Sequence, residues 1–397
     1  MSKTLQDYAT LINDTIQSNE INHYITTANM CQNLGGIDTF KNINIPQGKV
    51  RLFQKDDVLF SNIDPWHRQV YMAKQKGGCS SDVLVFRAKH IDSATLFAIL
   101  SSQSFINYVC LGSIGSKRKR GDKTHMMDFK IPTINFTIAK IFNSIQNKIE
   151  NNHKINELLH KILELLYEQY FVRFDFLDEN NKPYQTSGGK MKFSKELNRL
   201  IPNDFEVKTL GDNPLCNTIK TGVTPFKQKV YYETKHIQET LSLNQGLKVS
   251  YNKRPNRANM QPTIHSVWFA KMKNTKKHLF LNQHMQSWIK ESILSTGFCG
   301  LQCQKHTFEY IASTIKYSPF ETRKNNLATG ATQKAINIEM LDYIFILIPN
   351  KELLDNYSKI TKPLYEKISN NTIETQTLTA LRDFLLPLLL KQQVKPK

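Results

Sequence analysis

The 397-residue chain has no long apolar run. A membrane-spanning helix needs about 18 or more consecutive apolar residues, and the longest runs here, Ile344 to Ile348 and Leu385 to Leu390, are much shorter. The first residues, Met1 to Asp14, are polar and do not form the apolar core of a secretory signal. Six cysteines are too few to predict a disulfide framework in a chain of this size. We therefore expect a protein of the reducing cytoplasm.

Catalytic and metal-binding patterns are also missing. No GxxxxGK[ST] phosphate loop is present, so we do not expect this chain to hydrolyse ATP. Cys299, Cys303 and His306 lack the paired CxxC spacing of a zinc site. The sequence therefore predicts a non-catalytic chain that holds no metal.

One weak enzymatic pattern remains as an alternative. Glu206-Val207-Lys208, with Asp175 or Asp178 upstream, resembles the PD-(D/E)xK pattern of metal-dependent nucleases. A Glu-x-Lys triplet is common by chance, so this pattern alone is a poor predictor. A stand-alone DNA nuclease is the first alternative function.

Acidic residues are absent between Glu239 and Glu291. The same stretch contains Tyr251, Trp268 and Trp288 among its cations, which are Lys248, Lys253, Arg254, Arg257, Lys271, Lys273, Lys276, Lys277 and Lys290. The whole chain has a formal net charge of +19. Such an excess attracts polyanions, so nucleic acid is the leading partner class and an anionic membrane surface is the second.

The candidate DNA-binding residues fall into two groups. In the first half they are Ser116, Lys117, Arg118, Lys119, Arg120, Lys123 and Thr124, on a glycine-flanked loop that begins at Gly115. In the second half they are Lys253, Arg254, Arg257, Asn259, Lys271, Thr332, Gln333 and Lys334. Lys and Arg neutralise phosphates and can read guanine, and the amides of Asn259 and Gln333 can pair with adenine. A solvated charge run is the alternative interpretation of each group.

Short patterns from the first half return in the same order in the second half. Lys3-Thr4-Leu5-Gln6-Asp7 returns as Lys208-Thr209-Leu210-Gly211-Asp212. Lys148-Ile149-Glu150-Asn151-Asn152 returns as Lys367-Ile368-Ser369-Asn370-Asn371, and Leu159 returns as Leu378, both 219 residues later (367 − 148 and 378 − 159). Two diverged copies in tandem are the simplest explanation.

Each copy ends in a long helical pattern. Apolar residues spaced by three and four predict one amphipathic helix from about Ala139 to Phe171, roughly 50 Å long. A second helix is predicted from the N-cap Asn350 to Leu386, with a bend or break at Pro363. Asn152 and Asn371 fall on the apolar seams, where an asparagine fixes the register of packed helices. A frayed polar interruption that faces water is the alternative interpretation of both. We expect the two seams to pack antiparallel.

Before each helix, short apolar runs and turn-rich stretches predict an α+β body. The first body includes a helical pattern near Leu96 to Val109. The predicted order is a body at residues 1–137, a helix at 138–176, a linker at 177–203, a second body at 204–349 and a second helix at 350–397. The expected arrangement is a body at each end of the helix pair, related by a pseudo-twofold axis. Half-sites on one face of B-DNA recur every ~34 Å, so a spacer of about 50 Å suits two half-sites separated by several base pairs.

Taken together, these features resemble the specificity (S) subunit of type I restriction-modification systems. The residues that carry the resemblance are Asp57 to Ser61, Gly78 to Val85, the Gly115 to His125 loop with Met127 to Pro132, the 148–152 helix ending at Tyr170 to Asp175, Gly330 to Ile336, and Thr377 to Pro387. The resemblance implies two α/β target recognition domains, separated by a pair of long antiparallel coiled-coil helices.

The resemblance also implies a function and partners. The chain would be the non-catalytic, cytoplasmic subunit that reads a bipartite, gapped site in double-stranded DNA. It would dock two methyltransferase subunits and, in the full complex, two restriction subunits. S-adenosylmethionine, ATP and Mg²⁺ are then expected on those partner subunits and not on this chain. A basic coiled-coil scaffold without DNA sequence preference is the second alternative function.

Overall fold

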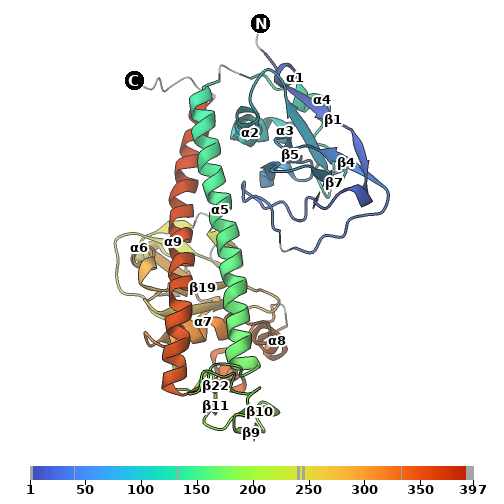
Figure 1. The fold of residues 1–397 in the computed structure, drawn as a ribbon. Helices are drawn as coiled ribbons and strands as arrows, with labels where there is room; N and C mark the ends of the chain where they lie inside the picture. Colours follow the sequence, from blue (N-terminus) through green and yellow to red (C-terminus); the bar gives the residue numbers. More distant parts are fainter. Residues whose placement is uncertain are drawn as a thin grey trace. The chain divides into compact units, whose positions relative to one another are not determined.

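The computed structural model describes residues 3–39, 41–131, 134–238, 242–243, 246–331 and 333–389. These residues form two compact units (Figure 1). Unit 1 comprises Met1–His153 together with Thr375–Lys397, and unit 2 comprises Lys154–Glu374. Each unit therefore contains one α+β body and a segment of both long helices.

The described residues of unit 1 form two four-stranded sheets. The first has the order β1-β8-β5-β6, with β1 at Ala9–Ile12, β8 at Val83–Ala88, β5 at Val58–Ser61 and β6 at Val70–Met72. The second has the order β2-β4-β7-β3, with β2 at Thr15–Gln17, β4 at Lys49–Phe53, β7 at Gly77–Cys79 and β3 at Tyr24–Ile25. The helices of this body are α1 (Leu5–Tyr8), α2 (Ser93–Ser101), α3 (Gln103–Leu111) and α4 (Lys123–Met127).

In unit 2, the part of the chain that the structure describes also forms two four-stranded sheets, with three two-stranded ones. The first sheet is β12-β21-β18-β19, at Cys216–Thr218, Phe298–Cys303, Ser266–Ala270 and His278–Leu281. The second is β16-β13-β20-β17, at Leu247–Val249, Lys229–Tyr232, Ser292–Ser295 and Ala258–Met260. The pairs are β9 (Met191–Ser194) with β10 (Arg199–Pro202), β11 (Glu206–Thr209) with β22 (Phe345–Ile348), and β14 (Ile237–Gln238) with β15 (Ser242–Leu243). The helices are α6 (Gln286–Glu291), α7 (Phe308–Lys316) and α8 (Ser318–Leu327).

The first sheet of each unit is the repeated element. Both are fully antiparallel and connect their strands in the same order along the chain. Their central strands are runs of buried apolar residues, as in Val58–Ser61 and Ser266–Ala270, so both faces of these sheets are covered. The second sheets differ in strand order and in which pair is parallel. Each body thus combines a constant sheet with a divergent one.

The repeated pattern that begins at Lys3 and again at Lys208 makes a similar backbone contact in both copies. The amide of Leu5 donates to the carbonyl of Phe129 (2.9 Å), and the amide of Leu210 donates to the carbonyl of Ile344 (2.7 Å). Both leucine side chains are buried. The sequence repeat is therefore a repeat of tertiary contacts.

The two predicted long helices are present. Helix α5 spans Phe136–Tyr167 and continues into a five-residue π-helix, Glu168–Val172. Helix α9 spans Lys351–Leu389, and the side chain of Asn350 caps it by accepting from the amide of Leu353 (2.8 Å). Helix α9 continues through Pro363, so the predicted break at this residue does not occur. A proline removes one backbone donor, and the burial of Tyr365 and Ile368 just beyond it holds the helix in place.

The segments of α5 and α9 run antiparallel within each unit (Figure 1). In unit 1, Asn152 donates to the hydroxyl of Thr375 (3.3 Å) and Arg382 donates to Gln146 (3.0 Å). In unit 2, Asn371 donates to the side-chain oxygen of Asn156 (2.8 Å). Both seam asparagines, Asn152 and Asn371, are buried. They lie in the helix contact and do not face water.

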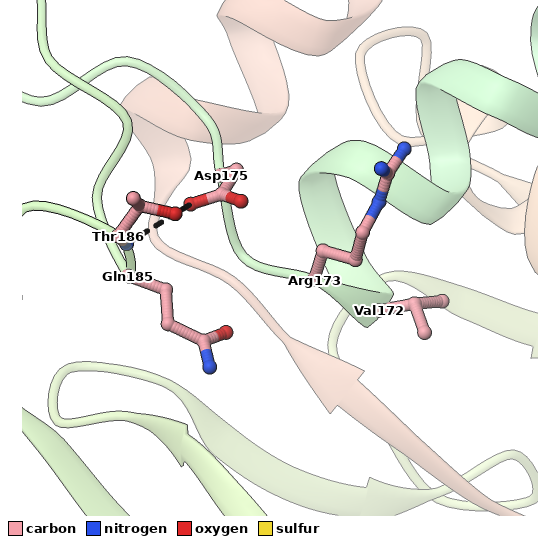
Figure 2. A pocket seen from close by; sticks show the side chains of 5 residues that line it. All are labelled: Val172, Arg173, Asp175, Gln185 and Thr186. Atoms are coloured by element: carbon pink, nitrogen blue, oxygen red, sulfur yellow. Dashed lines mark hydrogen bonds between the residues drawn. The ribbon is translucent and has the colours of Figure 1, made fainter.

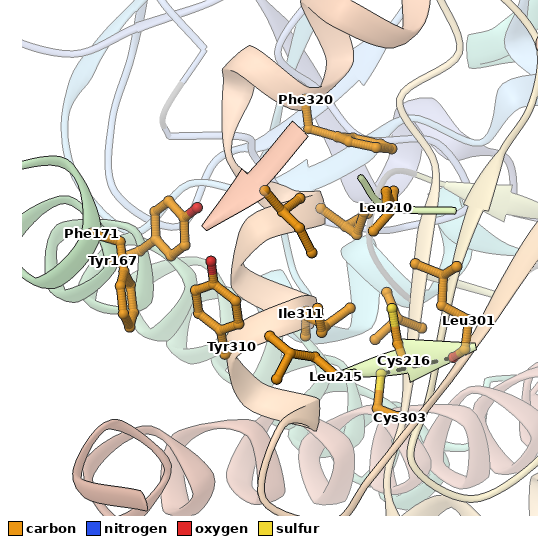
Figure 3. Packing of buried hydrophobic residues seen from close by; sticks show 14 of the residues in the cluster. Tyr167, Phe171, Leu210, Leu215, Cys216, Leu301, Cys303, Tyr310, Ile311 and Phe320 are labelled. Atoms are coloured by element: carbon orange, nitrogen blue, oxygen red, sulfur yellow. Dashed lines mark hydrogen bonds between the residues drawn. The ribbon is translucent and has the colours of Figure 1, made fainter. Parts of the chain in front are cut away.

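The predicted linker at 177–203 is wrong. This segment contains the antiparallel hairpin of β9 and β10. Ile201, on β10, is buried in the main core of unit 2, and this burial explains why the segment is ordered. Figure 3 shows another part of that core, where Tyr167 at the end of α5 and Phe171 of the following π-helix face Tyr310 of α7. Fully burying one such large side chain stabilises the fold by roughly 1.5–3 kcal/mol.

Candidate nucleic-acid interface

In unit 1 the predicted basic loop is closed at its base by backbone hydrogen bonds. Ile114 and Arg120 exchange both amide-to-carbonyl bonds at 2.9 Å. Gly115 begins the loop with a φ of +126°, and a Cβ atom there would lie 2.4 Å from the carbonyl oxygen of Arg118. Only glycine fits this backbone conformation without strain. The five residues from Ser116 to Arg120 are therefore displayed on a tight, exposed loop.

Side chains fix the two flanks of this loop. Asp64 accepts from the amide of Lys119 (3.1 Å), and Asp82 forms an ion pair with Arg120 (2.9 Å). Downstream, the side chain of Asp122 caps α4. His125 of α4 stacks on Tyr108 of α3 with ring centroids 4.0 Å apart. The cations of the loop are thus held on an ordered backbone, while Lys117, Arg118 and Lys119 remain exposed.

Unit 2 repeats this loop. Thr329 and Ala335 exchange amide-to-carbonyl bonds at 3.1 and 2.9 Å, as Ile114 and Arg120 do. Gly330 has the same φ of +126°, and a Cβ atom there would lie 2.7 Å from the carbonyl oxygen of Gln333. Of the predicted residues here, Gln333 and Lys334 are exposed, and Thr332 lies outside the described residues. The two candidate loops are therefore one structural element present twice.

The other predicted residues of unit 2 gather around this second loop. The amide of Lys273 donates to the carbonyl of Lys334 (2.8 Å), and the carbonyl of Lys271 accepts from Ile336 (3.0 Å). The amide of Lys271 donates to the carbonyl of Gly297 (2.9 Å). The amide of Thr296, the residue before Gly297, donates to the carbonyl of Arg257 (2.9 Å). These bonds join loops that are far apart in the sequence.

Asn259 joins the same cluster, since its amide donates to the carbonyl of Arg257 (3.0 Å). Lys253 and Arg257 are exposed, whereas Arg254 has structural partners. The Arg254 guanidinium donates to the carbonyls of Ala258 (3.2 Å) and Tyr251 (2.5 Å) and lies 4.0 Å from the centre of the Tyr251 ring. Arg254 therefore shapes its loop. The structure thus joins Arg257, Asn259 and Lys271 to the second loop, whereas none of these bonds links Lys253 to it.

A buried ionic cluster, which the sequence does not predict, supports the loop between β18 and β19. The ammonium of Lys324 on α8 is 0% exposed and donates to the carbonyls of Ala270 (3.1 Å) and Thr275 (2.9 Å). It also pairs with the carboxylate of Glu321 (2.7 Å), which contacts the imidazole of buried His278 (3.1 Å).

Burial lowers the pKa of Lys324 and of His278. In sequence, Glu321 and Lys324 form an ordinary i,i+3 pair like those on helix surfaces, so no sequence signal marks them as buried. Lys273 was named among the cations of the acid-free stretch, although it was not one of the candidate DNA-binding residues.

The residues of the alternative nuclease pattern do not form a metal site. An open hollow of about 470 Å³ is lined by Arg173, Asp175 and Thr186. Figure 2 shows that the side chain of Arg173 points away from Asp175 there. One carboxylate oxygen of Asp175 accepts from the amide and hydroxyl of Thr186 (3.0 and 2.8 Å). Lys208 lies 3.8 Å from Glu206 on β11. Within the described ranges, no group of three or more His, Cys, Asp or Glu residues is placed to hold a metal ion.

The cysteines set aside in the sequence analysis lie in the core. Cys299 and Cys303 are buried on β21, and burial raises the pKa of the Cys299 thiol to about 12. All six cysteines are free thiols. In the part of the chain that the structure describes, no single helix is long and apolar enough to cross a membrane, and only α2 and α3 together, bent by 59°, reach that length and composition.

Comparison with known proteins identifies relatives of one kind, although no protein-family model matches the chain. The specificity subunit of the type I restriction enzyme MjaIX of Methanocaldococcus jannaschii is 25% identical over 265 residues, which are 64% of this chain and 56% of that protein. The specificity subunit of the type I restriction enzyme HindI of Haemophilus influenzae is 23% identical over 321 residues, 65% of this chain and 66% of that protein. The matches therefore span less than two thirds of either curated relative.

The fold has a solved counterpart. The crystal structure of the type I restriction-modification S subunit from M. genitalium superposes with a TM-score of 0.56 at 15% identity, covering 98% of this chain and 96% of that one. The predicted resemblance to type I specificity subunits is therefore confirmed in sequence and in fold. Both curated relatives are named as the specificity subunit of an enzyme, which agrees with the prediction of a non-catalytic subunit.

Proposed function

We propose that this chain, similar in sequence and fold to type I specificity subunits, is the DNA-specificity subunit of a type I restriction-modification system. The observation that carries the proposal is the loop closed at Gly115 and again at Gly330, which displays predicted DNA-binding side chains in both units. One scaffold used twice with different side chains suits a protein that reads two different half-sites. Unit 1 presents Lys117 to Lys119, and unit 2 presents Gln333 and Lys334.

The long helices suit a gapped site. Helix α5 has 32 residues, so it is about 48 Å long at 1.5 Å per residue. Half-sites on one face of B-DNA recur every ~34 Å. A bipartite site with a gap of several base pairs is therefore the proposed target, and phosphate contacts from the exposed cations supply the salt-dependent part of the affinity.

The helices also present apolar side chains that fit a protein partner. Ile162 and Leu165 of α5 are 44% and 47% exposed in unit 2. Their equivalents 219 residues later, Leu381 and Phe384 of α9, are 44% and 67% exposed in unit 1. Exposed apolar clusters on a soluble protein mark interaction surfaces. Two equivalent surfaces support the docking of two copies of one partner, the methyltransferase subunit.

The catalytic components belong to those partners in this proposal. The two methyltransferase subunits bring S-adenosylmethionine, and two restriction subunits complete the complex with ATP and Mg²⁺. The chain itself supplies the DNA contacts and the docking surfaces, in the cytoplasm where the DNA lies. The arrangement of Asp175 and Glu206 does not support the nuclease alternative.

Methylome sequencing tests the proposal. Cells that express this chain with a type I methyltransferase subunit from the same genome should carry a gapped, two-part, adenine-methylated motif that is absent without the chain. Gly115→Ala should relax one half of the motif and Gly330→Ala the other half, because each Cβ atom meets a loop carbonyl. Gly48→Ala is the matched control, since Gly48 also has a positive φ but has open space around it.

The outcomes separate the alternatives. Identical methylation with and without the chain, in cells that contain the soluble complex, would reject the specificity-subunit function. A motif that keeps both halves in the Gly115 and Gly330 variants would reject the assignment of the loops. DNA binding with no sequence preference at all would favour the scaffold alternative.

A further inference from the structure

Exposed apolar side chains stand at the base of the basic loop of unit 1 and on the segments next to it. Leu111, the last residue of α3, is 85% exposed, and Ile114, at the base of the loop, is 74% exposed. Trp66 is 46% exposed on the short helix that follows Asp64, the residue bonded to Lys119. An apolar side chain this exposed gains nothing for the fold of unit 1. Its place beside the loop requires another explanation.

The backbone holds Ile114 with its side chain outward. Both its amide and its carbonyl are bonded to Arg120, so the residue cannot turn into the core. Gly112 packs against the ring of His125, where a Cβ atom would lie 2.2 Å away, and this contact fixes the turn between Leu111 and Ile114. The apolar surface is therefore as well ordered as the cations of the loop.

The same position in unit 2 is polar. Thr329 occupies the place of Ile114 in the equivalent backbone pair, and Asn326 stands where Leu111 stands, counted back from the loop glycine. Both are exposed. The scaffold thus accepts a polar residue here, and the isoleucine of unit 1 is not demanded by the closed loop itself.

We infer that Ile114, flanked by Leu111, is a specificity-determining residue that contacts the C5-methyl group of thymine in the half-site read by unit 1. The inference rests on the proposed function and adds the chemistry of one half-site. Lys117, Arg118 and Lys119 favour a polyanion over a protein as the occupant of this surface. In the major groove, the thymine methyl is the one apolar group on the base edges, and apolar side chains recognise it by contact.

Replacing thymine by uracil in the DNA removes only that methyl group. The complex of this chain with its methyltransferase subunits is titrated with DNA duplexes that contain the motif found by methylome sequencing. In these duplexes each thymine of one half-site is replaced in turn by uracil. The half-site of unit 1 is identified beforehand by exchanging residues 3–131 for those of another specificity subunit. At one position, uracil should weaken binding of the wild-type complex about fourfold, the ratio expected for burying one methyl group.

Ile114→Ser, which leaves a small polar side chain without a methyl group at this exposed position, should remove that preference. The variant should bind the thymine duplex about as weakly as the wild type binds the uracil duplex, with no further loss on uracil. Ile45→Ser is the matched control, because Ile45 is an exposed isoleucine of unit 1 that takes no part in the backbone bonds of this loop, and it should keep the full discrimination.

Equal affinity for thymine and uracil at every position of the unit 1 half-site would overturn the inference, as would a half-site without A·T pairs. Unchanged discrimination in the Ile114 variant would overturn the role of this residue. In each of these cases a gapped motif would still be present, so the proposed function would stand. Absence of any gapped motif would instead be a failure of the proposed function.

Discussion

Replacing Lys324 by Met should destabilise unit 2 strongly. The ammonium group is fully buried and donates to two backbone carbonyls and to Glu321, whose carboxylate is itself largely buried. Removing it leaves that negative charge with His278 as its remaining side-chain partner. Breaking a buried ion pair by removing one partner costs about 3–5 kcal/mol.

The effect can be measured by urea denaturation with tryptophan fluorescence. Trp268 and Trp288 are buried in unit 2, whereas Trp66 is half exposed in unit 1, so the signal reports mainly on unit 2. With an m-value of about 3 kcal/mol per molar urea, a loss of 3–5 kcal/mol lowers the midpoint by about 1–2 M. Lys305→Met is the matched control, because Lys305 is exposed and its loss should change stability by about 0.5 kcal/mol or less.

A second substitution separates charge from packing. Glu321→Gln in the Lys324→Met background removes the stranded carboxylate, so part of the lost stability should return. A midpoint for Lys324→Met within about 0.2 M of the Lys305 control, the shift that 0.5 kcal/mol gives, would refute the reasoning. So would a double variant that is less stable than Lys324→Met alone.

Two further predictions concern pH and partner docking. Burial lowers the pKa of His278 below its ordinary value of 6.5, so below that pH the unfolded chain binds a proton that the folded chain does not. The free energy of unfolding of unit 2 should therefore fall as the pH is lowered from 7 to 5.5, and the fall should be smaller in the His278→Gln variant. If the urea midpoint changes with pH by the same amount in the wild type and in this variant, the prediction is contradicted. Leu165→Asp and Phe384→Asp should each reduce the methyltransferase copies per chain from two to one, measured by native mass spectrometry, with exposed Lys154→Asp as control. Two copies retained in both variants would exclude these surfaces from docking.

The sequence predicted the long helices because their signal is local. Spacing by three and four fixes an amphipathic helix wherever it folds, and the N-cap at Asn350 was correct. The sequence did not predict the continuation of α9 through Pro363, because flanking tertiary contacts outweigh one missing backbone donor. It also missed the hairpin at 177–203, whose polar, glycine-containing composition is typical of a linker.

For the candidate site, the sequence identified residue types and the structure supplied their neighbours. The glycine of each loop was visible, but its φ of +126° and the backbone pair that closes the loop were not, because glycine adopts positive and negative φ about equally readily. The convergence of Arg257, Lys271 and Lys334 arises only when four loops meet. Burial of Lys324 was not predictable, because a helical Glu and Lys three residues apart usually lie on a surface.

The discontinuity of unit 1 has a consequence for how the chain is synthesised. The core of this unit includes Leu386 of α9, and Arg382 is bonded to Gln146 of α5. Residues up to His153 leave the ribosome long before these partners exist. At 5–20 residues per second, the wait is roughly 10–50 s. During that interval the apolar face of the first segment of α5 is exposed, so the first body to be translated is the last to be completed.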